Sequence, residues 1–236
     1  MDGVLSGAGF ILDGEEGRHA ATVRRIRAGE RIVLADGAGV IAHCEVTAAG
    51  SGRLDLRVDD VERLPPPPLA LALAQALAKG GRDEQAVETA TEIGVDVVLP
   101  WQAGRSVVRW QGERGDRARR RWETIAREAA KQSRRSRVPV VEEARSTPAL
   151  ARRAGAATLA LVLHEAAERP LLDVPLPQAG EVLVIVGPEG GIGDEELAVL
   201  TDAGAVAVRL GPEVLRASTA GPVTLGWLAA QTGRWA

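Results

Sequence analysis

The chain has 236 residues, of which 45% are hydrophobic and 26% are charged, and its formal net charge is −3. These values are typical of a globular protein and exclude a disordered, collagen-like or coiled-coil chain. Its apolar runs, such as residues 69–78, are too short to span a bilayer, and the first twenty residues lack a signal-peptide pattern. We therefore expect a cytoplasmic protein with no membrane association.

Cysteine and histidine are too sparse for a disulfide framework or a metal centre. Cys44 is the single cysteine, and we expect it to be a small buried hydrophobic residue. The three histidines, His19, His43 and His164, are far apart and show no metal-ligand spacing. The sequence therefore predicts neither a zinc nor an iron site.

The clearest boundary in the chain is a run of four prolines at residues 65–68, which is excluded from helix and sheet interiors. Before it, residues 31–35, 40–46 and 54–61 have the pattern of short strands, and Asp36-Gly37 is a hairpin turn signal. This first part is predicted to be a small β barrel or sheet.

After the prolines, strand-length apolar runs alternate with helical patterns. The expected strands are residues 69–76, 96–100, 158–164, 182–186 and 205–210. The expected helices are residues 82–93, 117–133 and 194–203, with a last helix from about Pro222. Such alternation predicts an α/β domain with a parallel sheet covered on both faces.

The strongest local signal is the glycine-rich loop that follows the apolar strand 182–186. The loop, Gly187-Pro188-Glu189-Gly190-Gly191-Ile192-Gly193, runs into a helix for which Asp194 is the expected N-cap. Ligands of open α/β sheets bind at this end of the strands. The glycine spacing fits neither a dinucleotide nor a P-loop motif, and the acids near the helix start would repel a pyrophosphate. The loop is better suited to a neutral or positively charged ligand.

A second loop, residues 209–222, follows the next strand. Thr219 or Ser218 is expected to cap the last helix, with Pro222 in its first turn. Arg216 lies within this loop with no nearby helix face to explain it. The alternative is that both loops are ordinary strand-to-helix connections.

Gly187-Pro188-Glu189-Gly190-Gly191 and Leu210-Gly211-Pro212-Glu213-Val214-Leu215-Arg216, in this order, resemble the last two motifs of a known family. That family is the bacterial 16S ribosomal RNA uridine-N3 methyltransferases, the RsmE type within the SPOUT superfamily. Further similar stretches are Lys79-Gly80-Gly81-Arg82, Glu92-Ile93-Gly94-Val95, Pro100, Arg105-Ser106-Val107, residues 122–128 and Arg137-Val138-Pro139. Residues 19–25, Gly29-Glu30 and Asp36-Gly37 resemble its PUA-like RNA-binding barrel.

The resemblance implies a PUA-like β-barrel domain at residues 1–66 and a SPOUT methyltransferase domain at residues 67–236. The latter would have a parallel sheet and a C-terminal deep trefoil knot, bind S-adenosylmethionine in the knot and work as a homodimer. By this resemblance the cofactor-binding residues are Leu163, His164, Gly187, Pro188, Glu189, Gly190, Gly191, Leu210, Gly211, Val214, Leu215, Ala217 and Thr219. Glu189 would provide negative charge near the sulfonium.

The implied reaction is methylation of N3 of a specific uridine near the 3′ end of 16S ribosomal RNA, in the assembled small subunit. N3 carries a weakly acidic proton, so the proton must leave and the developing anion must be stabilised. Arg216 is our candidate catalytic residue, placed beside the base to favour the uridinate by its charge. The alternative is that Arg216 only pairs with Glu213 or a helix end.

The target base has to unstack from its neighbouring bases, so the enzyme must bind the surrounding RNA backbone. Residues 113–137 contain ten basic and four acidic residues, a local charge of +6 in a chain of −3. The candidate RNA contacts are Arg18, His19, Arg24, Arg25, Lys79, Arg82, Arg105, Lys131, Arg134 and Arg135. For each of them alone, a solvated surface charge is an equally good interpretation.

The sequence departs from the family pattern at Ala217-Ser218-Thr219, where many members have Thr-Glu-Thr, and at Thr89 and Gly104. The change at Ala217-Ser218 is the one hint of a non-enzymatic RNA-binding relative. A SPOUT methyltransferase acting on a ribose 2′-hydroxyl or on transfer RNA is a second alternative, which the first-domain motif and the segment at residues 79–105 disfavour. The spacing of Trp122, Ile125, Ala126 and Ala129 indicates core packing rather than a stacking platform for bases.

Overall fold

The computed structural model describes residues 7–235, and the chain divides into two compact units, Met1–Pro66 and Pro67–Ala236. The proline run at residues 65–68 spans the junction, where ring-locked backbone and missing N–H groups prevent either sheet from continuing. No helix within residues 7–235 is long and apolar enough to cross a membrane.

The first unit is an antiparallel sheet with the strand order β1-β4-β3-β2. Its strands are β1 (Gly9–Leu12), β2 (Arg31–Ala35), β3 (Val40–Gly50) and β4 (Arg53–Arg63). The predicted hairpin joins β2 to β3, where the Asp36 carboxylate accepts hydrogen bonds from the N–H groups of Ala38 and Val40 at 2.7 and 3.0 Å. Within residues 7–66 no pairing of β1 with β2 closes the expected barrel.

Two short helical segments, α1 (Gly14–Arg18) and the π-helical turn η1 (His19–Val23), connect β1 to β2. The sequence pattern did not predict them, because they are too short to show a helical period. The core of this unit comes from alternate residues of the strands and includes Cys44, which is buried as expected.

The second unit has a parallel sheet with the order β11-β9-β10-β5-β6-β7, and β8 also pairs with β6. Its strands are β5 (Leu69–Ala76), β6 (Val97–Gln102), β7 (Val140–Val141), β8 (Arg145–Ser146), β9 (Leu159–Leu163), β10 (Gly180–Val186) and β11 (Val206–Val208). Its helices are α2 (Arg82–Ile93), α3 (Gly112–Gln132), α4 (Thr147–Ala156), the 3₁₀ turn η2 (Leu171–Asp173), α5 (Asp194–Asp202) and α6 (Ala217–Gln231).

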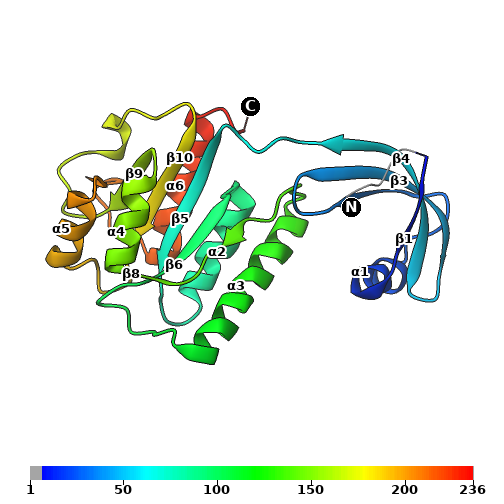
Figure 1. The fold of residues 1–236 in the computed structure, drawn as a ribbon, viewed down its shortest axis with the longest axis horizontal. Coiled ribbons are helices and arrows are strands. Elements are labelled where there is room, and N and C mark those ends of the chain that lie inside the picture. The colour runs from blue at the N-terminus through cyan, green and yellow to red at the C-terminus, as the bar shows by residue number, and fades with distance from the viewer. Residues whose placement is uncertain (1–6, 236) are drawn as a thin grey trace. The chain divides into compact units, whose positions relative to one another are not determined.

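Helices cover both faces of this sheet, as the alternating pattern predicted (Figure 1). Leu71 and Leu73 of β5 belong to a core with residues of α2, α3 and α6, including Trp122. Ala72 and Ala74 point to the other face, where α4 and α5 pack. Because neighbouring residues of one strand are buried on opposite faces, β5 is apolar along nearly its whole length.

Three helix boundaries differ from the sequence-based expectation. α6 begins at Ala217 with Arg216 as its N-cap, so Pro222 lies inside the helix and Thr219 is not the cap. α3 begins at Gly112, five residues before the expected start at residue 117. α5 has Gly193 rather than Asp194 as its N-cap, and Asp194 is its first helical residue. The acid remains in the first turn, where the helix dipole favours negative charge.

Candidate functional site

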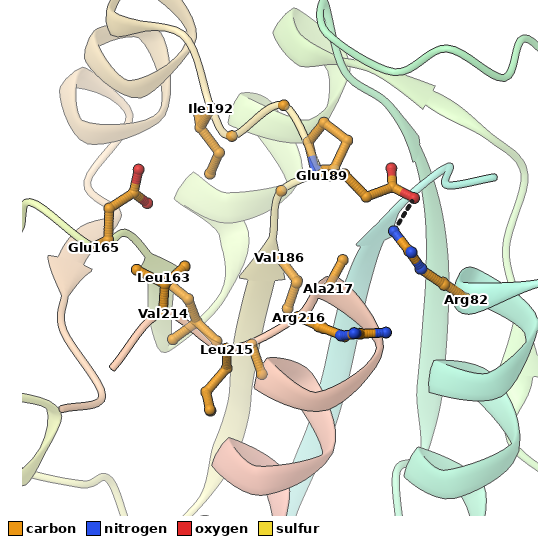
Figure 2. Close-up of a pocket in the computed structure, with 15 residues that line it drawn as sticks. Arg82, Leu163, Glu165, Val186, Glu189, Ile192, Val214, Leu215, Arg216 and Ala217 are labelled. Atoms are coloured by element: carbon orange, nitrogen blue, oxygen red, sulfur yellow. Dashed lines mark hydrogen bonds and ion pairs between the residues drawn. The ribbon is translucent and has the colours of Figure 1, made fainter. Parts of the chain in front are cut away.

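A pocket of about 400 Å³ lies at the carboxyl end of β9 and β10. Four segments form it: the end of β9, the loop after β10, the chain that enters α6 with the first turn of that helix, and the start of α2, which contributes Arg82 (Figure 2). The lining residues are Arg82, Leu163, Glu165, Val186, Gly187, Pro188, Glu189, Gly190, Gly191, Ile192, Val214, Leu215, Arg216, Ala217 and Ala220. The two loops singled out in the sequence therefore share one cavity.

The loop after β10 folds back on itself so tightly that its glycines are required. A Cβ atom at Gly187 would lie 2.7 Å from Cγ1 of Ile192, and Gly191 has a φ of +73°. The N–H of Gly191 donates to the carbonyl of Pro188 at 2.9 Å, which closes a turn. This conformation lets backbone groups of the glycines approach the cavity beside the side chains of Glu189 and Ile192.

The loop that follows β6 is hydrogen-bonded to the glycine-rich loop from outside the pocket. Arg105 Nη1 donates a hydrogen bond to the carbonyl of Gly190 at 3.0 Å. Nearby, the Glu196 carboxylate accepts hydrogen bonds from the N–H of Gly104 at 2.9 Å and from Thr147 Oγ1 at 2.5 Å. Three segments distant in sequence are thereby joined to the loop that lines the pocket.

The pocket carries charges of both signs. Arg82 Nη1 lies 3.1 Å from Glu189 Oε1, with the two side chains 37% and 24% exposed (Figure 2). The charge of Glu189 is thus already partly compensated. Glu165 is an exposed carboxylate that forms no hydrogen bond or ion pair within residues 7–235. Arg216, also exposed, lies at the N-terminus of α6.

The structure separates the predicted cofactor residues into two groups. Those that line the pocket are Leu163, Gly187, Pro188, Glu189, Gly190, Gly191, Val214, Leu215 and Ala217. Those outside its lining are His164, Leu210, Gly211 and Thr219. His164 Nδ1 accepts a hydrogen bond from the N–H of Ala166 at 3.3 Å, and Thr219 is exposed on α6.

The sequence reasoning missed four lining residues, Glu165, Val186, Ile192 and Ala220, and Arg82 was named only as an RNA contact. Ile192 belongs to the glycine-rich loop itself, and Glu165 follows the end of a strand. Both residues could therefore have been predicted from the sequence. Ala220 enters through α6, which begins earlier than expected.

The candidate RNA contacts in the first unit are grouped in one segment. Arg18, His19, Arg24 and Arg25 lie at the end of α1 and around η1, and all four are exposed. In the second unit, Lys79 is exposed in the loop between β5 and α2.

The three candidates after α3 differ in their surroundings. Lys131 lies 3.1 Å from Glu128, and Arg134 is exposed in a left-handed conformation with a φ of 57°. Arg135 does not fit the expected role, because only 14% of its side chain is exposed. Its guanidinium donates to the carbonyls of Thr91 and Val95 at 2.8 and 2.7 Å, and burial lowers its pKa. Arg135 therefore fixes the C-terminal end of α2 instead of facing solvent.

Residues 65–229 match the family described as RNA methyltransferase domain, and residues 12–59 match the family described as RNA methyltransferase PUA domain. The chain is 52% identical to ribosomal RNA small subunit methyltransferase E of Mycobacterium bovis, over 98% of this chain and 89% of that protein. It is 31% identical to the protein of the same name from Bacillus subtilis, over 94% of this chain and 90% of the relative.

A solved structure with the same fold is that of ribosomal RNA small subunit methyltransferase E from Neisseria gonorrhoeae bound to S-adenosylmethionine. The TM-score is 0.84 at 26% sequence identity, and the match covers 98% of this chain and 94% of the other. The similarity thus extends over both units of the chain.

Proposed function

Because this chain belongs to the family of ribosomal RNA small subunit methyltransferases E, we propose that it methylates N3 of one uridine near the 3′ end of 16S ribosomal RNA. Its methyl donor is S-adenosylmethionine, and we place the reaction on the assembled small subunit in the cytoplasm. The observation that carries the proposal is the pocket shared by the glycine-rich loop and the chain entering α6.

The residues around this pocket fit the donor. Leu163, Val186, Ile192 and Leu215 provide apolar surface suited to the adenine ring, and the folded loop provides backbone donors and acceptors. The Glu165 carboxylate suits the positive charges of the sulfonium and the amino group. Because Glu189 is paired with Arg82, we assign the stronger electrostatic role to Glu165.

S-adenosylmethionine supplies a methyl group on a sulfonium; as the new N3–C bond forms, the S–C bond breaks and the N3 proton leaves to solvent. The task of the protein is to align the two reactants and to stabilise the anionic base. We propose that Arg216 stabilises the negative charge of the base, since it lines the pocket from the N-cap of α6.

The helix end adds to this effect. The backbone N–H groups of Ala217 and Ser218 precede the first hydrogen bonds of α6, which Thr219 and Ala220 donate to the Arg216 carbonyl, and the helix dipole favours negative charge there. Arg216 and the α6 N-terminus therefore act in the same direction on a uridinate placed at this edge of the pocket.

The route of the C-terminal segment supports the proposed trefoil knot. After β11 at one edge of the sheet, residues 214–217 pass beside the loop at residues 187–192 in the pocket lining. α6 then packs on β5 and β10 in the middle of the sheet. The proposed knot requires that this segment pass through the earlier loop, an arrangement that is rare among proteins.

The homodimer is supported by the composition of α6. This helix contains no charged residue and is predominantly apolar, yet Val223 is 49% exposed and Val214 just before the helix is 77% exposed. An apolar helix without a polar face normally has its whole surface covered. A second copy of the chain would cover the remaining side of α6.

The test is methyl transfer from labelled S-adenosylmethionine to small subunits that lack this modification, followed by primer extension. A block at a single uridine near the 3′ end of 16S RNA is expected, because N3 methylation removes a base-pairing position. Absence of label on both subunits and naked RNA, despite bound donor, would refute the proposed substrate.

A further inference from the structure

Helix α3 separates an apolar face from an exposed face that is rich in arginine and also carries Glu113 and Asp116 near its start. Its residues Trp122, Ala126 and Ala129 are buried in the core on the sheet side. The opposite side carries Arg117, Arg120, Thr124 and Arg127, which are all exposed. The helix therefore packs through one face and leaves a row of arginines on the other.

The arginines of α3 fall into two classes by their contacts. Arg119 lies 2.8 Å from Glu123, and Arg121 Nη2 donates to Glu84 of α2 at 2.7 Å. In contrast, the side chains of Arg117, Arg120 and Arg127 form no hydrogen bond or ion pair within residues 7–235. We call these three the α3 arginine face.

Folding alone does not explain the α3 arginine face. At 100° per residue the three side chains lie within one side of the helix, and with a rise of 1.5 Å per residue they span about 15 Å. Arg117 and Arg120 lie one helical turn apart, a spacing at which like charges destabilise a helix. An acidic chain of net charge −3 nevertheless concentrates positive charge here.

We propose that the α3 arginine face binds consecutive phosphates of the RNA backbone that flanks the methylated nucleotide. This inference rests on the proposed RNA substrate and adds a surface that the candidate contacts at Lys131, Arg134 and Arg135 did not include. The guanidinium group suits this ligand because its planar donors match two phosphate oxygens. Backbone contacts of this kind position the RNA without reading its sequence.

Two double variants on the same helix test the proposal. Arg120→Gln/Arg127→Gln removes two members of the α3 arginine face, whereas Arg119→Gln/Arg121→Gln removes two ion-paired arginines and the same total charge. The probe is an in vitro transcript of the 3′ part of 16S ribosomal RNA, and its affinity is measured between 50 and 200 mM salt. Donor binding by calorimetry and thermal unfolding show whether each variant is folded.

We expect Arg120→Gln/Arg127→Gln to weaken RNA binding about tenfold or more at 0.1 M salt and to lower the salt slope by about 2. The ion-paired control should keep the wild-type slope within about 0.5, and both variants should bind the donor normally. Equal losses in the two variants would refute specific phosphate contacts. Unchanged binding of the transcript together with weaker binding of whole subunits would also refute the proposal, in favour of an acidic protein partner.

The comparison of RNA affinity between the two double variants does not depend on whether the protein methylates RNA. If the wild-type protein binds the donor but methylates no ribosomal RNA, the proposed function fails. The difference in transcript affinity between the two double variants still decides whether the α3 arginine face contacts phosphates.

Discussion

Arg105 donates a hydrogen bond from Nη1 to the carbonyl oxygen of Gly190 at 3.0 Å, and so joins the loop after β6 to the pocket loop after β10. A Cβ atom at Gly190 would lie 3.2 Å from Cβ of Arg105, so the two backbones approach closely as well. Arg105, which the sequence suggested as an RNA contact, is therefore also placed to hold the loop in the conformation that lines the pocket.

Replacement of Arg105 by alanine is expected to raise the dissociation constant of S-adenosylmethionine about tenfold. Hydrogen bonds from charged groups contribute about 1.5–3 kcal/mol, and 1.4 kcal/mol corresponds to a factor of ten. The measurement is calorimetric titration with the donor. The matched control is Arg109→Ala, since Arg109 donates to the Gly104 carbonyl at 3.2 Å and not to the pocket loop. Equal donor affinity of wild type and Arg105→Ala would show that the hydrogen bond from Arg105 to Gly190 is not needed for donor binding.

Replacement of Arg216 by alanine is expected to reduce single-turnover methyl transfer by about 100-fold or more, because the anionic base loses its neighbouring positive charge. Donor affinity should change only a few fold. Arg209→Ala is the control, since Arg209 is exposed in the same connection but does not line the pocket. A normal rate in Arg216→Ala would remove this residue from the mechanism.

Much of the second unit was predictable because its boundary signals are local. β5 and α2 have the expected bounds, residues 69–76 and 82–93, since prolines precede the strand and Gly94, with a φ of 121°, ends the helix. The start of α6 was misplaced because Pro222 has the signature of a first turn although it lies deeper in the helix.

The site was predictable only where its residues lie within one motif. The glycine-rich loop and residues 214–217 were identified because each is a contiguous pattern after a strand. The pairing of Arg82 with Glu189 joins residues 107 positions apart, and the burial of Arg135 depends on α2 packing beside it. Such contacts arise from tertiary packing. The sequence alone does not show whether a given charged residue is buried or exposed.

The C-terminal end of the chain is fixed by a largely buried ion pair. Arg234 contacts Asp96 with two hydrogen bonds, Nη1–Oδ2 at 2.5 Å and Nη2–Oδ1 at 3.0 Å, and the side chains are 17% and 16% exposed. Arg234→Ala should lower the free energy of unfolding by roughly 1–3 kcal/mol, because Asp96 loses its bidentate partner but keeps Arg135 Nη2 at 3.7 Å. Urea unfolding measures this, with Arg152→Ala on α4 as an exposed control; a change as small as in the control would contradict the assignment.

Asp83, at the start of α2, should make the free energy of unfolding depend on pH. Burial raises the pKa of its carboxyl group, although hydrogen bonds from the N–H groups of Ala78 and Glu84 oppose the shift. A carboxyl group whose pKa is higher in the folded state contributes stability below its unfolded pKa, near 4, and this contribution is lost as the pH rises through the folded pKa.

The measurement is urea unfolding of wild type and Asp83→Asn at pH 4 and pH 7. The wild type should gain stability relative to the variant as the pH is lowered, since the asparagine does not titrate. A difference that is constant with pH, or that grows toward pH 7, would contradict a raised pKa.

In the proposed reaction, the pocket of Gly187–Ile192 and Val214–Ala217 delivers a methyl group to N3 of a uridine. The most direct test is nucleoside mass spectrometry of small subunits that lack the modification, after incubation with this protein and S-adenosylmethionine. We expect about one 3-methyluridine per subunit with wild type and almost none with Arg216→Ala. A 2′-O-methylated nucleoside, or no methylated uridine despite bound donor, would contradict the proposed reaction.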